Sequence, residues 1–279
     1  MRIKQRAGLS NRFHPEVALA YEWYACTQSP RGTVLFLHGL GSCGADWSLQ
    51  LPPFRVCYDV LTLDLPGHGS SPAMTGHWRI EAMAEKVSGL LADVAAEPVH
   101  VVGLSLGGTV ALALALTHPE QIRSLVLVNS FARLQIDRAG RGRISRRLFN
   151  LMRGDMLALG KTVAGGVFPH PDQRELREIA ARRIAQNSRQ AYLAALFALR
   201  RFDVLARLEA VATPTLVISG EADTTVAAAA KLELAEHIPG AVFESIPGSG
   251  HATPLDEPDR FNELVLSFFE KHTAIEYVD

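Results

Sequence analysis

One serine stands among glycines in the segment GLSLGG, residues 103–108, directly after the apolar run VHVV. Ser105 has Gly103 two positions before it and Gly107 two positions after it. A serine hydroxyl becomes a nucleophile when a sharp strand-to-helix turn holds it clear of the backbone and within reach of a base. Chance alone produces this motif in about one chain in ten of this size. Its place between an apolar strand and an apolar helix favours a nucleophile over a passive turn serine.

Two later segments supply the base and the acid that a serine nucleophile needs. His251, in GSGHATP, follows the last expected strand, and its small neighbours leave the loop free to lean over the sheet. Asp223, in GEADTT, follows the preceding expected strand, and Glu221 competes with it from one residue after the strand end. The chain order Ser, Asp, His is the order expected for a G-x-S-x-G turn on such a sheet. We therefore predict Ser105 as nucleophile, Asp223 as acid and His251 as base.

The segment HGLGSCG, residues 38–44, places a glycine-rich turn after another expected strand. This turn could direct the N–H of Leu40 at the same point as the N–H of Leu106, which follows the serine. Two backbone donors that converge on one oxygen stabilise an oxyanion in the transition state by about 3 kcal/mol or more each. We predict that Leu40 and Leu106 form an oxyanion hole.

The same segment also satisfies G-x-G-x-x-G, and Asp64 ends the next strand 20 residues after Gly44. This spacing imitates a dinucleotide-binding turn. Pro52 and Pro53 arrive eight residues after Gly44, where the helix of a dinucleotide site normally continues. Nucleotide binding is therefore disfavoured, and no metal or organic cofactor is expected, because no metal-binding motif is present.

Apolar runs alternate with amphipathic helical stretches, which is typical of an α/β fold with a mostly parallel sheet flanked by helices. The expected strands are residues 33–38, 60–64, 99–103, 124–129, 215–220 and 241–246. One amphipathic helix has its apolar stripe from Met83 to Val94, and the last has its stripe from Phe261 to Phe269.

Residues 131–207 contain no expected strand, and the segment RELREIAARRIAQNSRQAYLAALFALRRF reads as two helices. We predict a core domain of residues 1–130 and 208–279 and a helical cap of residues 131–207. Arginines crowd the first part of this cap, among them Arg143, Arg146 and Arg147. They are candidates to bind an anionic acyl group or an acidic carrier protein. The alternative is a solvated helix face.

The 279 residues carry a net charge of −1 and are 48% hydrophobic, which suits one large soluble domain. A charge near zero argues against a general nucleic-acid binder. No segment offers about 20 apolar residues for a membrane span, and the N-terminus has no apolar stretch typical of a leader. Three cysteines without metal-type spacing favour reduced thiols and a cytoplasmic protein.

Six segments in order resemble the α/β-hydrolase fold superfamily over nearly the whole chain: HGLG, DLPGHGSS, GLSLGG, ALTHPEQIRSLVLVNS, GEAD and GSGHATPLDEPDRFN. The resemblance implies a helical cap after the sixth strand and the same roles for the five predicted site residues. Asp64 and His68 match a turn that is usually structural in the family. Asn129 stands where some relatives place the acid, and an asparagine cannot do that work, which favours Asp223.

Together these features predict a serine hydrolase that cleaves carboxylic esters of small to medium acyl groups through an acyl-enzyme. The expected partner is a small-molecule ester or lactone, with no nucleic acid and no membrane insertion. Enol-lactone opening and carbon–carbon bond hydrolysis use the same three side chains and remain alternatives. A receptor that binds a ligand in the same pocket without turnover is the alternative from another class.

Overall fold

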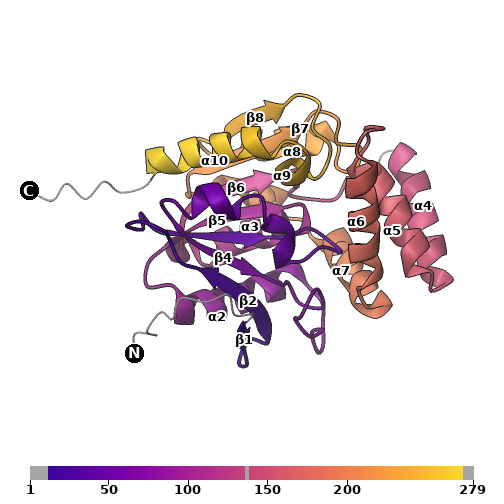
Figure 1. Ribbon diagram of the computed structural model, residues 1–279, viewed down its shortest axis with the longest axis horizontal. Coiled ribbons are helices and arrows are strands. Elements are labelled where there is room, and N and C mark those ends of the chain that lie inside the picture. Colours follow the sequence, from indigo (N-terminus) through magenta and orange to yellow (C-terminus); the bar gives the residue numbers. More distant parts are fainter. Residues whose placement is uncertain (1–11, 136–137, 273–279) are drawn as a thin grey trace, which may run out of the picture.

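The computed structural model describes residues 12–135 and 138–272 and is built around one eight-stranded sheet (Figure 1). The strands are β1 (Arg12–His14), β2 (Leu19–Tyr24), β3 (Thr33–Leu37), β4 (Asp59–Leu63), β5 (Val99–Leu104), β6 (Ile122–Val128), β7 (Thr215–Gly220) and β8 (Val242–Ile246). Their order across the sheet is β1-β2-β4-β3-β5-β6-β7-β8. Strands β1 and β2 pair antiparallel, and all other pairings are parallel. The predicted α/β class is confirmed.

All six predicted strands are present, with ends displaced by at most two residues. These six strands could be predicted because a parallel strand that is covered on both faces has a continuous apolar run in its sequence. Strands β1 and β2 were missed. β1 has only three residues, and β2 ends in the half-buried sequence EWY at the antiparallel edge, so neither forms such a run.

Helices cover both faces of the sheet, as the alternation of side chains along β3 illustrates. Leu35 and Leu37 pack into a core with α2 (Ile80–Val94), α3 (Leu106–Thr117) and α8 (Ala228–His237). Val34 and Phe36 point to the other face and pack with α1 (Leu51–Phe54) and α10 (Pro258–His272). In Figure 1, α2 and α10 lie on opposite sides of the sheet. The remaining short helix, α9 (Thr253–Asp256), precedes α10.

Four helices lie between β6 and β7 and stand beside one end of the sheet in Figure 1. They are α4 (Arg138–Met152), α5 (Met156–Val167), α6 (Arg174–Ala185) and α7 (Arg189–Arg201). The chain leaves and re-enters the core at adjacent points, because Arg133 bridges Asp203 and the N–H of Val204 donates to the oxygen of Ala132 at 3.1 Å. Helices α6 and α7 correspond to the two helices predicted there. The division into a core and a cap domain remains a prediction.

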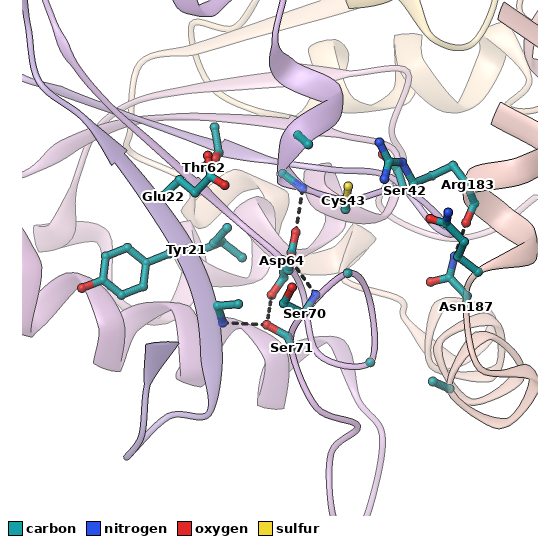
Figure 2. Close-up of a pocket in the computed structure, with 18 of the residues that line it drawn as sticks. Tyr21, Glu22, Ser42, Cys43, Thr62, Asp64, Ser70, Ser71, Arg183 and Asn187 are labelled. Atoms are coloured by element: carbon teal, nitrogen blue, oxygen red, sulfur yellow. Dashed lines mark hydrogen bonds between the residues drawn. The ribbon is translucent and has the colours of Figure 1, made fainter. Parts of the chain in front are cut away.

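The turn after β4 is held by the carboxylate of Asp64, which accepts hydrogen bonds from the N–H groups of Gly44 at 2.8 Å and Ser70 at 2.7 Å (Figure 2). This turn borders a cavity of about 580 Å³, into which Arg183 and Asn187 reach from the α6 side (Figure 2). Both carboxylate oxygens of Asp64 therefore accept backbone hydrogen bonds that hold this turn. No long helix follows the glycines, since α1 has four residues.

Within the described residues, no helix is both long enough and apolar enough to cross a membrane.

Candidate active site

Ser105 occupies the sharp turn between β5 and α3 with φ 52° and ψ −110°, a backbone conformation that costs a non-glycine residue about 1–3 kcal/mol. Its N–H donates to the oxygen of Val128 at 2.9 Å, which ties the turn to β6. The backbone carbonyl oxygen of Ser105 accepts hydrogen bonds from the hydroxyl of Ser130 at 2.9 Å and from the N–H of Thr109 at 3.0 Å. These contacts hold the strained turn and present the serine at the N-terminus of α3.

The glycines around Ser105 permit close backbone packing. A Cβ atom on Gly103 would lie 2.4 Å from the oxygen of Gly107. A Cβ on Gly107 would lie 2.1 Å from the oxygen of Leu37 in β3. Any larger residue at either position would push α3 away from the sheet.

His251 and Asp223 form a buried hydrogen-bonded pair. The ring Nδ1 of His251 lies 3.0 Å from Oδ2 of Asp223, which fixes Nδ1 as the donor when the carboxylate is ionised. The other carboxylate oxygen accepts the N–H of Thr225 at 2.7 Å, and the Asp223 side chain is fully buried. The competitor, Glu221, is exposed and accepts from the hydroxyl of Ser245 instead.

Lys231 on α8 is the member of this cluster that sequence reasoning missed. Its side chain is 1% exposed, and its ammonium lies 3.1 Å from Oδ2 of Asp223, the same oxygen that faces His251. It also contacts Oδ1 of Asn129 at 3.3 Å. The local sequence AAAKLELAEH gives no sign of this burial, because a lysine in such a helix usually faces water.

Burial and charge act in opposite directions on this cluster. Burial by itself would raise the pKa of Asp223, but the charge and hydrogen bond of His251, together with Lys231, lower it below its usual value. Burial lowers the pKa of Lys231, and attraction to Asp223 only partly offsets that effect. Asp223 is therefore a firmly ionised carboxylate that can orient an imidazole and stabilise its protonated form.

Asn129, at the end of β6, joins the loop of Asp223 to the loop of His251. Its Oδ1 accepts from the N–H of Gly220 at 2.8 Å, next to the Asp223 loop. Its amide nitrogen donates to the oxygen of His251 at 2.8 Å and to the hydroxyl of Thr253 at 2.8 Å. Its φ of 45° lies in the left-handed region, which asparagine tolerates better than most residues. Asn129 is thus a structural connector.

The predicted oxyanion donors are available in the described structure. Among the hydrogen bonds of residues 12–135 and 138–272, none uses the N–H of Leu40 or Leu106 as its donor. The loop of Leu40 is positioned by His38, whose Nδ1 donates to the oxygen of Gly39 at 2.8 Å while Nε2 accepts the N–H of Leu65 at 2.9 Å. These two bonds require a neutral ring. Burial lowers the pKa of His38 to about 4, which keeps it neutral at physiological pH.

The helical segment between β6 and β7, which comprises α4 to α7 and is called the insertion below, also contacts this loop. The side-chain nitrogen of Asn187, between α6 and α7, donates to the oxygen of Gly41 at 2.9 Å. Gly41 has φ +81°, and a Cβ there would lie 3.0 Å from Ile184 and 3.1 Å from Tyr192. The loop that carries the predicted donor is therefore packed between the sheet and the insertion.

One cavity of about 610 Å³ brings Ser105, His251, Asp223 and Leu40 together. No hydrogen bond joins Ser105 to His251 within the described part of the chain, although both side chains line this space. Such contacts are often long without substrate and shorten when it binds. The cavity walls are largely apolar and include residues of α4, α5, α6 and α7. Its volume is in the range of small-molecule sites.

The three candidate arginines of α4 have different positions. Arg147 lines the cavity and is half-buried. Arg146 is exposed and is not part of the cavity wall. The side chain of Arg143 lies outside the described structure.

Comparison with known proteins identifies the family. A model of the alpha/beta hydrolase family matches residues 34–264. The chain is 30% identical over 260 residues to a Caulobacter vibrioides protein named carbamate hydrolase RutD, covering 90% of this chain and 95% of the relative. It is 29% identical over 260 residues to 3-oxoadipate enol-lactonase 2 of Acinetobacter baylyi, covering 92% and 94%. A solved hydrolase from Pseudomonas aeruginosa superposes with a TM-score of 0.83 at 30% identity, covering 95% and 99%.

The chain therefore belongs to the α/β hydrolase family, as its motifs predicted. It is a hydrolase, and its sheet order and flanking helices agree with that assignment.

Proposed function

We propose that the protein hydrolyses carboxylic esters of small to medium acyl groups by two-step acyl transfer. The hydroxyl oxygen of Ser105 attacks the carbonyl carbon while His251 takes the hydroxyl proton of Ser105. Asp223 stabilises the resulting imidazolium. The N–H groups of Leu40 and Leu106 bind the oxyanion. The alcohol leaves with a proton from His251, and water activated by the same ring then releases the acid.

One observation carries this proposal: the strained Ser105 turn and the His251–Asp223 hydrogen bond border the same cavity. A strained serine without a structural explanation points to function, since the backbone cost needs a compensating reason. The buried, ionised Asp223 supplies the anion that a protonated imidazole needs. The names of the relatives describe carbonyl hydrolysis as well, on a carbamate in one case and on an enol-lactone in another.

Replacement of the nucleophile tests the proposal directly. Ser105→Ala should lower kcat on p-nitrophenyl butyrate by about 10⁴-fold or more and leave the circular dichroism spectrum unchanged. His251→Ala should cause a loss of similar size, because the two groups act as a unit. Activity that survives the serine change would show that another residue is the nucleophile.

Enol-lactone hydrolysis is the second candidate, favoured by the relative of that name. Ring opening uses the same attack and the same oxyanion, so the site alone does not separate the two substrates. A panel of acyl esters, lactones and vinylogous diketones, measured side by side, ranks ester, lactone and carbon–carbon cleavage by kcat/KM. A protein that turns over none of them but gains thermal stability from one would be a receptor.

A further inference from the structure

Arg147 places a positive charge on the wall of the cavity that contains Ser105. Its Nε atom is buried and has no hydrogen-bond partner in the described residues. No ion pair to its guanidinium occurs among those residues either. Arg183, the other arginine on the same wall, differs in this respect because it pairs with Asp46 at 3.2 Å. The charge of Arg147 is thus the uncompensated one.

Tyr192 on α7 adds a second polar group to the wall of the same cavity. The Tyr192 ring is 1% exposed, lines the same cavity, and its hydroxyl makes no hydrogen bond within the described structure. Burial raises the pKa of Tyr192, while the nearby charge of Arg147 acts to lower it. The phenol therefore remains a hydrogen-bond donor at neutral pH, in the same cavity wall as the guanidinium of Arg147.

Among the described residues, the rest of the wall offers Arg147 no free carboxylate as a counter-ion. The acidic side chains that line the cavity are Asp46 and Asp223, and both are engaged, by Arg183 and by His251 with Lys231. Aliphatic residues such as Ile144, Val163 and Leu196 form much of the remaining surface. A half-buried guanidinium without a counter-ion is costly, and a bound anion removes that cost.

We propose that Arg147, with Tyr192, binds a carboxylate at the far end of the acyl chain whose carbonyl is attacked by Ser105. The substrate class is therefore the monoesters or lactones of dicarboxylic acids, with an apolar chain between the two functional groups. The planar fork of arginine suits a carboxylate, which it binds through two parallel hydrogen bonds. This inference rests on the proposed esterase function, whose site it extends.

A matched pair of esters tests the subsite. Monoethyl adipate is anionic, and ethyl hexanoate is neutral with the same chain length. In Arg147→Gln, the ratio of kcat/KM for the anionic ester to that for the neutral ester should fall at least about tenfold from its wild-type value. Arg146→Gln removes the same charge one residue away, at an exposed position, and should keep the wild-type ratio. The succinate and suberate pairs then locate the preferred chain length.

Equal falls in both arginine variants would indicate long-range attraction alone and would contradict the subsite, as would an unchanged ratio in Arg147→Gln. If Arg147→Gln does not fold, Arg147→Lys decides the question. It keeps the charge but loses the two-pronged contact, so the ratio should drop by about threefold. A wild-type ratio in that variant would again overturn the proposal.

A binding measurement separates this inference from the proposed function. Adipate should bind the Ser105→Ala protein in a calorimetric titration, and adding Arg147→Gln should weaken that binding at least about tenfold. Adipate binding without any ester turnover would refute the esterase and preserve the anion subsite. Turnover of neutral esters with adipate binding that ignores Arg147 would refute the subsite and preserve the esterase.

Discussion

At the scale of single residues, Lys231 shares the carboxylate of Asp223 with His251. Its ammonium faces the same oxygen of Asp223 that receives the hydrogen bond from His251. Two cations therefore compete for one carboxylate whenever the ring is protonated. Lys231 helps to keep this carboxylate ionised, because its positive charge lowers the pKa of Asp223.

Lys231→Met should move the acidic limb of the kcat/KM profile to higher pH. Without the ammonium, one of the charges that lower the pKa of Asp223 is lost, so the carboxylate that faces His251 takes up a proton at a higher pH. Lys161→Met, at an exposed position on α5, is the control for charge. A lower melting temperature with an unmoved acidic limb would mean that Lys231 serves the fold alone.

The sequence allowed Ser105, Asp223 and His251 to be chosen as candidates, because each lies in the segment that follows a recognisable strand. The structure gathers all three at one cavity, and their catalytic roles remain the proposal tested above. The burial of Lys231 could not be predicted from the sequence, since it depends on how α8 packs against the loop of Asp223. The unpaired state of Arg147 likewise depends on contacts with residues distant in sequence.

At the scale of elements, the loop after β3 depends on the insertion for its position. Asn187 holds the oxygen of Gly41, and the predicted donor Leu40 is the residue next to it. The site is therefore assembled from both parts of the chain. A weakened contact here should disturb the placement of the oxyanion more than the binding of the acyl group.

Asn187→Ala should lower kcat several-fold on every ester, with a smaller effect on KM. The lost hydrogen bond loosens a loop that matters mainly in the transition state, and mutations of oxyanion groups act on kcat. Asn150→Ala is a matched control, because the side chain of Asn150 donates a hydrogen bond to Thr162 at 3.1 Å within the insertion and makes no hydrogen bond to that loop among the described residues. Identical kinetics in the two variants would contradict a role for Asn187 in positioning.

At the scale of the whole molecule, three buried histidines make the fold sensitive to acid. Burial lowers the pKa of His38 to about 4 and the pKa of both His68 and His100 to about 3. Above the unfolded pKa of about 6.5, both states are neutral and stability is complete. As the pH falls below that value, these histidines bind protons in the unfolded chain but stay neutral in the folded chain. The free energy of unfolding then decreases until the folded pKa is reached.

Each of these histidines should lower the free energy of unfolding by up to about 1.4 kcal/mol for each unit that the pH falls between pH 6.5 and about pH 4. Urea titrations at pH 5, 6 and 7 measure the slope. His100→Gln should reduce it by about one proton, because that ring is buried against Phe269 and hydrogen-bonded to Ser124. His77→Gln, at an exposed position, is the control. A slope that His100→Gln leaves intact would place the acid sensitivity elsewhere.

The chain crosses from the core into the insertion and back at one narrow place, where Arg133 bridges Asp203 and Val204 bonds Ala132. Segments whose ends meet are readily exchanged between proteins, because the host needs to close only a short gap. Residues 133–203 could thus be replaced as a cassette from another family member while the strands that carry Ser105 and His251 stay intact. A change of substrate range would then require one splice rather than a redesign of the sheet.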